Sequence, residues 1–439
     1  MPEVVPPLKL MPKNTNAPLQ FNYIPYPLWR RRTSALLQSV VEPVYKRVYP
    51  VAEDRNPPQT AERMAAYLAR FGLLGTDDEH TIQRMLEGIN GRTNIERAST
   101  DVPASNHNTP KTPLRIPAQW EPMEAVIVNF PILYPPLWEL HAQMIEGIVP
   151  VARVTVTVPT EMWACAAWLY LQNRAKLDDS QLENIKFLIL PTDDIWVRDY
   201  GPIIGYDADG ARVALDAHYE RQKPFGNLRD DNMPILWAAH TETPLISLDL
   251  NTEGGNLWSD GQGTLIMSNV ILEVNPAYDR AALERYLHNI FDYEKLILTP
   301  RMAIESTGHI DLLLKLADPE TVLVSAPTTR TSAQRLRDTA DLFRRETNAQ
   351  NQPYRVIELP TPSLYLNWLA YPIRRSYTNA LTVNGRVLVP VYGLNTDEEA
   401  LRIYAETMPD YEIIPIDCEI GANGGGAVHC MTKEVPVRR

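Results

Sequence analysis

The apolar and polar positions divide the chain into two parts with different periodicity. Up to about residue 113, apolar residues recur at helical spacing in short stretches between polar or proline-rich segments. From residue 114 onward, short apolar runs that end in proline or glycine alternate with helical stretches. The first part reads as an irregular proline-rich segment over 1–33, helices over 34–48, 59–74 and 78–90, and a linker over 93–113.

The second part repeats one unit, a strand followed by a helix and another strand. The predicted units cover 125–131, 137–148 and 154–159, extended by 161–175 and 187–191; 270–276, 279–290 and 296–300; 321–327, 331–346 and 355–360; and 387–393, 397–408 and 411–417. An additional strand precedes two of them, over 309–316 and 379–383. Recurrence at roughly 50–60 residues favours a propeller-like array of mixed α/β modules. A doubly wound parallel sheet is the alternative.

Composition narrows the class of protein. With 44% hydrophobic and 22% charged residues the chain is typical of a globular protein, and no apolar run reaches the length of a transmembrane helix. The first thirty residues hold no apolar core of a secretory signal, so we expect a cytoplasmic protein that does not bind membranes. A net charge of −12 argues against a nucleic-acid partner and favours a small cationic substrate. Self-association stays open.

The cysteines indicate a reduced protein with at most one working thiol. Cys165, Cys418 and Cys430 form neither a disulfide framework nor a zinc motif. Cys430 follows a run of three glycines and a histidine, in Gly424-Gly-Gly-Ala-Val-His-Cys430. Glycines allow close backbone approach, which suits a reactive site. A loop beside an inert, buried cysteine is the structural alternative.

Polar residues gather after several of the predicted strands. These segments are Trp196-Val-Arg-Asp-Tyr-Gly-Pro202, Glu253-Gly-Gly-Asn256 and Thr307-Gly-His-Ile-Asp311. Polar groups that converge at one end of a repeated architecture predict a site there. Each also has a structural interpretation: an Arg198–Asp199 ion pair in a turn, a satisfied core histidine at 309, and a loop held by Glu253.

The combination of residue types indicates a reaction. His309 and Asp311 lie two apart in a predicted strand and would share one face. A planar guanidinium matches carboxylates bidentately, which leaves its central carbon open to attack by a thiolate. A histidine could then protonate the leaving ammonia and later activate water. We therefore predict hydrolytic deimination of a guanidino group through a covalent thiouronium intermediate, with neither a metal nor an organic cofactor.

These segments, with Ser376-Tyr-Thr-Asn379, resemble the agmatine deiminase and bacterial-type peptidylarginine deiminase family in the same order, over about 115–435. The resemblance implies an α/β fold, the five-module pseudo-symmetric α/β propeller of guanidino-group modifying enzymes, for a catalytic domain over 114–439. Residues 1–113 remain an N-terminal helical extension of unknown role. By similarity Cys430 is the nucleophile and His309 the general acid and base, while Asp199 and Asp311 hold the guanidinium. Trp196, Asn379, Glu253 and Gly426 would line the substrate site.

The substrate beyond its guanidino group is less determined. Agmatine deiminases commonly carry Asn where this chain has Ala427, and Arg221 and Lys223 have the spacing of a carboxylate-binding pair. We therefore favour peptidyl or free arginine, converted to citrulline, although the two basic residues could equally be solvated loop charges. The first alternative is agmatine, converted to N-carbamoylputrescine. Further alternatives are an amidinotransferase and a non-catalytic binding protein on the same scaffold.

Overall fold

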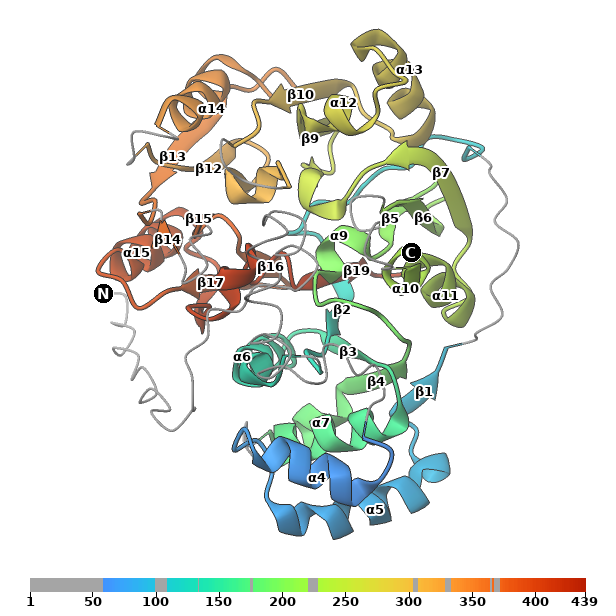
Figure 1. The fold of residues 1–439 in the computed structure, drawn as a ribbon. Helices are drawn as coiled ribbons and strands as arrows, with labels where there is room; N and C mark the ends of the chain where they lie inside the picture. Colours follow the sequence, from blue (N-terminus) through green and yellow to red (C-terminus); the bar gives the residue numbers. More distant parts are fainter. Residues whose placement is uncertain are drawn as a thin grey trace, which may run out of the picture.

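The structure is a computed structural model in which short sheets and their helices lie around the short helix α9 (Val197–Tyr200) and the C-terminal strand β19 (Thr432–Pro436) (Figure 1). The described residues are 58–98, 109–132, 134–173, 177–219, 228–302, 307–327, 333–363, 365–366 and 372–439. The predicted irregular segment 1–33 and the predicted helix 34–48 lie outside these residues. Within the described part, no helix combines the length and the apolar character needed to cross a membrane. Helices and short strands follow one another along the described residues, so the fold is mixed α/β, as the repeating pattern predicts.

Four three-stranded sheets in the described residues share one arrangement. The middle strand of each pairs antiparallel with the strand before it and parallel with the strand after it. They are β5 (Ile203–Tyr206), β6 (Arg212–His218) and β7 (Leu245–Asn251); β8 (Trp258–Ser259), β9 (Thr264–Ser268) and β10 (Lys295–Thr299); β11 (Leu314–Leu316), β12 (Thr321–Ser325) and β13 (Arg355–Leu359); and β16 (Leu381–Val383), β17 (Arg386–Val391) and β18 (Glu412–Asp417). A small hairpin is formed by β14 (Tyr365–Leu366) and β15 (Pro372–Ile373).

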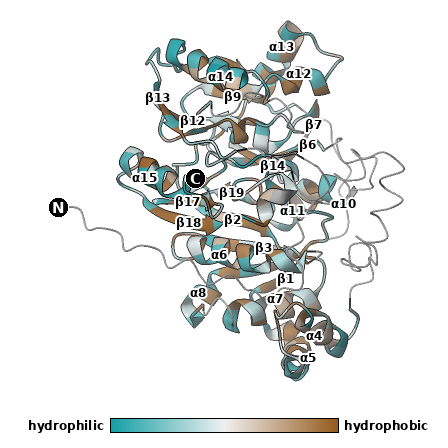
Figure 2. Cartoon of the chain, turned by 60° about the vertical axis from the view of Figure 1, so that its left-hand side comes forward, coloured by the Kyte–Doolittle hydropathy of each residue, from teal (hydrophilic) through white to brown (hydrophobic). Residues whose placement is uncertain are grey.

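Helices join the parallel strands, because two parallel neighbours need a crossover connection. These are α10 (Leu228–Asp231), α11 (Met233–His240), α12 (Val270–Val274), α13 (Arg280–Ile290), α14 (Ala333–Arg345) and α15 (Asp397–Thr407). In Figure 2 the outer helices α13 and α14 alternate hydrophilic and hydrophobic residues, while β17 and β18 are largely hydrophobic. The helices thus bury one face on the sheets and present the other to solvent.

The first sheet contains both early and final parts of the chain. Its parallel strands β2 (Met123–Asn129), β3 (Arg153–Val158) and β4 (Ile185–Ile189) are connected through α6 (Trp138–Ile148), α7 (Glu161–Asn173) and α8 (Asp179–Glu183). The C-terminal strand β19 (Thr432–Pro436) pairs antiparallel with β2. This sheet therefore repeats the arrangement of the other four, with its antiparallel strand supplied by the end of the chain. Closure of the five sheets into a propeller stays a prediction.

The described part of the N-terminal extension packs against the first sheet. Helices α4 (Ala61–Ala69) and α5 (Glu79–Glu87) pack on α7, and both contribute to the same hydrophobic core as β2 to β4. The Thr60 side chain caps α4 by accepting a hydrogen bond from the Arg63 backbone N–H at 3.2 Å. The Tyr67 ring lies edge-on to Trp163 at 6.3 Å. Helices were predicted here; their place on α7 follows only from the structure.

Three sequence-based predictions of secondary structure are wrong. Residues 95–97, placed in a linker, form the short strand β1 (Ile95–Arg97), which pairs with β4 and is too brief to show a period. The predicted strand 270–276 forms helix α12, because a short apolar run does not distinguish a strand from a buried helix. The predicted strand 309–316 begins only at Leu314, and a 3₁₀ turn, η6 (Ile310–Leu312), precedes it.

The packing of α4 predicts that the extension unfolds together with the first sheet. Leu68 is fully buried on α4, so Leu68→Ala should remove about 2–5 kcal/mol of stability through lost contacts and the cavity left behind. Urea unfolding followed by circular dichroism measures this loss. Arg63→Ala on the exposed face of α4 is the matched control and should leave the transition in place. An unchanged transition for Leu68→Ala would show that the extension is not part of the cooperative unit.

Candidate active site

Five segments of the chain bring the predicted site residues together. These are α9 (Val197–Tyr200), the turn η5 (Gly254–Asn256), η6, the loop before β16, and the loop before β19. The residues brought there are Trp196, Asp199, Glu253, His309, Asp311, Asn379, Gly426 and Cys430, and each side chain or glycine is buried or nearly so. Arg221 and Lys223 lie outside the described residues.

The imidazole of His309 lies between two carboxylates. Its Nε2 is 2.5 Å from Glu253 Oε2, and its Nδ1 is 3.4 Å from Asp199 Oδ1. Burial by itself would lower the pKa of His309, but the charges of Asp199 and Glu253 outweigh it and raise the pKa to about 10. Burial also raises the pKa of Asp199 to about 7; the charge of His309 opposes this rise, while Glu253 and Asp311 add to it. The ring is therefore an imidazolium at neutral pH, hydrogen-bonded to Glu253 at Nε2 and ion-paired with Asp199 at Nδ1.

Cys430 is buried beside a third carboxylate. Its Sγ lies 3.5 Å from Asp311 Oδ2, and Asn379 Nδ2 donates to Sγ at 3.1 Å. Asn379 Oδ1 accepts hydrogen bonds from the backbone N–H groups of Ala427 and Cys430, at 3.0 and 3.3 Å. Burial raises the pKa of the Cys430 thiol well above its usual value, and the charges of Asp311 and Asp199 raise it further. Burial and the neighbouring carboxylates therefore favour the neutral thiol over the thiolate.

Two glycines leave room for these groups. A Cβ on Gly426 would lie 2.6 Å from Trp196 Cζ3 and 2.9 Å from Cys430 Sγ. A Cβ on Gly255 would lie 2.5 Å from His309 Nδ1 and 2.7 Å from Asp199 Oδ1. The predicted role of the glycine run, close approach of backbone to reactive groups, fits this crowding.

One step of the sequence reasoning was wrong although the residues do converge. His309 and Asp311 share no strand face, because His309 precedes η6 and Asp311 lies within it. The turn places the Asp311 side chain beside Cys430 instead. The structural alternative considered for Asp199, a turn ion pair with Arg198, does not form, because Arg198 pairs with Glu434 at 2.6 Å.

A buried polar layer behind the site was missed from the sequence. It contains Gln119, Arg198, Lys315, His429, Lys433 and Glu434. The signal available was a charged residue inside an apolar strand: Lys315 interrupts a run of leucines, and Lys433 and Glu434 lie within the final strand. Buried charges of this kind need partners, and a functional site is one reason to keep them.

The site residues could also be considered as metal ligands. Asp199, Glu253 and His309 present ligand atoms within 4.8 Å of one another. However, both nitrogens of His309 already face carboxylates, and a protonated imidazolium has no lone pair for a metal ion. A metal ion would have to displace Asp199 or Glu253 from the ring, so these residues fit an ion poorly.

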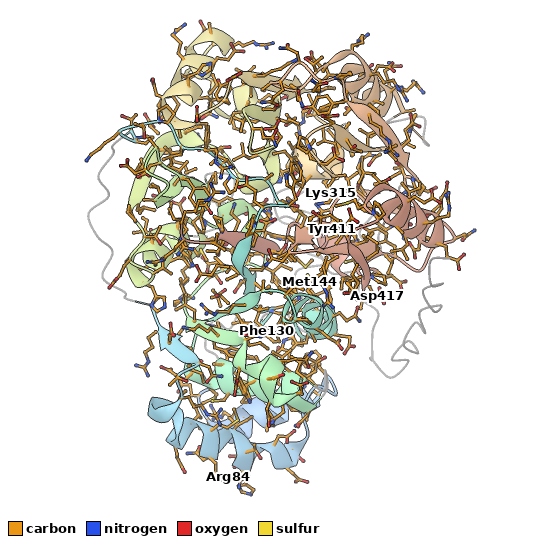
Figure 3. All side chains as sticks on the ribbon, turned by 180° about the vertical axis from the view of Figure 1, so that it is seen from behind. Arg84, Phe130, Met144, Lys315, Tyr411 and Asp417 are labelled. Atoms are coloured by element: carbon orange, nitrogen blue, oxygen red, sulfur yellow. The ribbon has the colours of Figure 1, made fainter. Side chains whose placement is uncertain are left out.

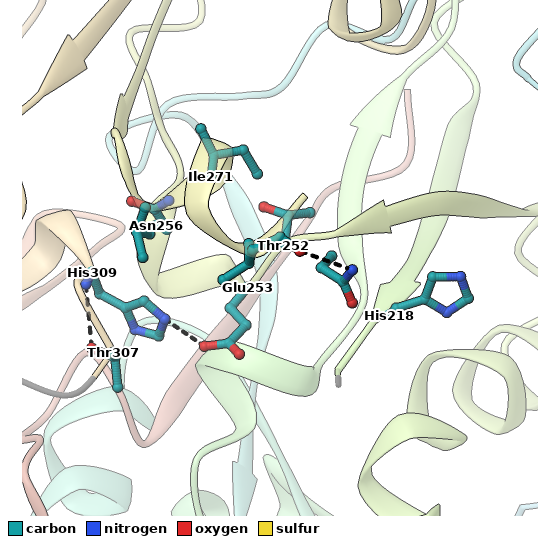
Figure 4. A pocket seen from close by; sticks show the side chains of 10 residues that line it. His218, Thr252, Glu253, Asn256, Ile271, Thr307 and His309 are labelled. Carbon is teal, nitrogen blue, oxygen red and sulfur yellow. Dashed lines mark hydrogen bonds and ion pairs between the residues drawn. The ribbon is translucent and has the colours of Figure 1, made fainter. Parts of the chain in front are cut away.

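A pocket of about 230 Å³ opens beside Glu253 and His309. Figure 4 shows Glu253 directed toward the His309 ring, with His218 on the opposite side. The wall includes Val270, Ile271 and Val274 of α12 together with polar groups of Asn251, Thr252, Asn256 and Thr307. Among the described residues of this lining there is an acid, Glu253, and neither lysine nor arginine.

Comparisons with known proteins agree with the fold and the motifs. The family model of Porphyromonas-type peptidyl-arginine deiminase matches residues 115–436. Agmatine deiminase of Pseudomonas aeruginosa (strain LESB58) is 28% identical over 361 residues, covering 74% of this chain and 96% of that protein. The structure of Enterococcus faecalis agmatine deiminase aligns with a TM-score of 0.67 at 22% identity, covering 74% of this chain and 96% of that one. The structure of C. jejuni agmatine deiminase with substrate bound aligns with a TM-score of 0.63 at 18% identity, covering 73% of this chain and 96% of that one.

The family match covers well over half of the chain, with the ordered motifs on which the resemblance was based. The relatives are covered almost completely. The chain therefore belongs to the Porphyromonas-type peptidyl-arginine deiminase family, whose relatives include agmatine deiminases and whose enzymes are hydrolases acting on C–N bonds of linear amidines.

Proposed function

We propose that this chain is a cysteine-dependent deiminase that hydrolyses agmatine to N-carbamoylputrescine and ammonia. One observation carries the proposal: two buried carboxylates flank a single imidazolium, and a third lies beside a buried thiol. Asp199 and Glu253 flank His309, and Asp311 lies at 3.5 Å from Cys430 Sγ. This immediate site carries more negative than positive charge, which a bound cation would balance.

A guanidinium suits this place better than a compact ammonium. Its planar fork of N–H donors can bond to Asp199 and Asp311 at once, whereas an ammonium is a point charge. The Gly426 backbone packs against both Trp196 and the thiol, so the indole ring lies near the reacting sulfur. Binding of the cation would also lower the pKa of the Cys430 thiol, because a nearby positive charge favours the thiolate.

The proposed chemistry has two halves. Cys430 first loses its thiol proton to water as the cation binds. The thiolate forms a C–S bond with the guanidine carbon, and the C–N bond to one amino group breaks as the His309 imidazolium donates a proton to that nitrogen. Ammonia leaves, and a thiouronium remains on the sulfur. Water then attacks the same carbon, gives a proton to the neutral His309, and the C–S bond breaks to release a ureido product and the thiol.

The choice of agmatine corrects our preference for arginine. That preference depended on Ala427, which stands where agmatine deiminases commonly carry Asn, and on Arg221 and Lys223, which lie outside the described residues. The relatives identified above are agmatine deiminases, and the pocket beside Glu253 has an acidic group and an aliphatic wall. These features suit a methylene chain that ends in an amine. Peptidyl-arginine stays the second candidate because of the description of the family model.

The strand order of the sheets supports a proposal about the architecture. We infer that the five sheets are the modules of a closed propeller over 114–439, with 1–113 as an extension. The shared strand order of the sheets supports this inference, as does the return of β19 to β2.

An assay of ammonia and ureido product tests both the reaction and the substrate. The compounds compared are agmatine, free arginine, and peptides with C-terminal or internal arginine. We expect the highest kcat/KM with agmatine and no turnover by Cys430→Ser. Cys165→Ala is the control and should keep activity, since Cys165 lies in the apolar core of α7. Full activity of Cys430→Ser would contradict the mechanism, and a preference for arginine peptides would favour the second candidate.

Substitution of Gly426 tests the geometry around the thiol. Gly426→Ala places a methyl group against Trp196 and Cys430, so kcat/KM should fall by about 100-fold through misplacement of the reacting atoms. Gly91→Ala is the control, because a Cβ there would meet no atom within 4 Å. Wild-type kinetics of Gly426→Ala would show that the thiol is not confined as proposed.

Chelation separates this mechanism from one that depends on a metal. Because the His309 nitrogens face Asp199 and Glu253, dialysis against EDTA should leave kcat and KM unchanged. Loss of turnover that added zinc or manganese restores would overturn the assignment of His309 as a proton donor.

A further inference from the structure

The buried layer behind Cys430 contains a continuous chain of hydrogen bonds. Lys315 Nζ donates to Gln119 Oε1 at 2.9 Å, and Gln119 Nε2 lies 2.7 Å from His429 Nε2. His429 Nδ1 lies 2.8 Å from Asp311 Oδ2, the oxygen that faces Cys430 Sγ. Lys315 lies in the interior of the molecule, near the middle of the view in Figure 3. The chain thus runs from a buried cation to the carboxylate beside the nucleophile.

The partners of Gln119 determine the orientation of its amide. The oxygen receives hydrogen bonds from Lys315 Nζ and from the Thr382 backbone N–H, at 2.9 and 3.3 Å. The amide nitrogen has two hydrogens, one directed to the Glu434 carboxylate and one to His429 Nε2. A flipped amide would place its NH₂ group against two donors, so this orientation is the satisfied one.

The orientation of Gln119 in turn determines the tautomer of His429. An amide NH₂ only donates, so His429 Nε2 must accept and the ring proton must be on Nδ1. The ring therefore donates from Nδ1 to Asp311 Oδ2. It is held in plane by stacking on Trp258, with ring centroids 5.0 Å apart at 13°.

The surroundings keep this imidazole neutral. Burial lowers the pKa of His429 well below its usual value, and the cations that face it lower the pKa further. The charged or titratable groups packed around the ring are Arg198 of α9, Lys315 of β11, Lys433 and Glu434 of β19, and Asp311, His309 and Cys430 of the site. A neutral donor can orient a carboxylate without cancelling its charge, which an imidazolium would do.

We propose that His429, with its tautomer set by Gln119 and Lys315, is a positioning residue that holds Asp311 as an oriented carboxylate for the guanidinium. This role rests on the proposed deiminase function and assigns a task to a residue outside the predicted catalytic set. His429 itself reaches the reaction only through Asp311. Without its N–H, the Asp311 carboxylate would depend more on the Cys430 S–H as a donor, which would retain the thiol proton more tightly.

Two substitutions at 429 separate this hydrogen bond from the packing of the ring. His429→Phe keeps a ring to stack on Trp258 but has no donor. His429→Asn loses the ring but keeps an N–H donor at the position of Nδ1. We expect His429→Phe to lower kcat/KM for agmatine by about 10- to 100-fold, the loss of one hydrogen bond to a charged group. His429→Asn should recover most of this loss.

A second measurement needs no substrate. The rate of Cys430 alkylation by iodoacetamide is followed against pH, with the labelled peptide identified by mass spectrometry. The midpoint should move to higher pH in His429→Phe and return toward the wild-type value in His429→Asn. Gln119→Leu should move it in the same direction but less, because the ring can then adopt either tautomer.

His141→Phe is the matched control. His141 is a fully buried histidine on α6 whose Nδ1 is bonded to the Leu137 carbonyl oxygen at 3.0 Å, away from the site. Its variant should leave the alkylation midpoint unchanged, whatever its effect on thermal unfolding.

The outcomes separate the two proposals. If the wild-type protein turns over no guanidino compound, the proposed function fails, and alkylation still tests His429. The positioning role is overturned if kcat/KM of His429→Phe stays within about threefold of the wild-type value and its alkylation midpoint stays at the wild-type pH. It is also overturned if His429→Asn is as impaired as His429→Phe, since restoring the N–H donor to Asp311 would then recover nothing. Should His429→Phe not fold, an unshifted midpoint in Gln119→Leu overturns the role.

Discussion

The antiparallel pairing of β19 with β2 is the constraint on which the site depends. It returns the last residues of the chain to the first sheet, with Lys433 opposite Ile127 and Glu434 opposite Val126. The loop just before β19 carries Cys430, so the position of the thiol follows from this register. Arg198 holds the same loop with two hydrogen bonds. Its Nε–H donates to the His429 carbonyl oxygen at 3.1 Å, and its backbone N–H donates to the Cys430 carbonyl oxygen at 3.2 Å. Asp199, the next residue in sequence, is thereby held close to Cys430.

The interior near this strand holds many charges, arranged in two layers. The layer behind the site is largely paired, as in the Arg198–Glu434 ion pair and the bond from Lys315 to Gln119. Burial lowers the pKa of Lys315 to about 7, so even this cation is held at a cost in desolvation. The front layer has carboxylates in excess over cations, a balance that a substrate guanidinium would restore.

The repeating pattern and the ordered motifs were sufficient to predict much of the fold and of the site. Apolar runs ending in proline or glycine predicted β3, β12 and β17, because buried parallel strands show nearly continuous hydrophobicity. The same rule failed at 270–276, where a short apolar run forms α12. Local pattern also could not show that Asp311 meets Cys430 from a turn rather than from a strand face. Gln119 and His429 had no signal of their own, since their importance depends on partners distant in sequence.

The sequence by itself determined the α/β class, the family, and a set of a thiol, a histidine and carboxylates, because periodicity and motif chemistry are local properties. Only the tertiary structure decided which of these groups touch. It placed Glu253 against His309, Asp311 beside Cys430, and His429 between Asp311 and Gln119. Contacts of this kind arise from strand register and burial, which join residues hundreds of positions apart. Burial also sets the charge states, because the protonation of His309 and the thiol of Cys430 depend on neighbours that no single segment contains.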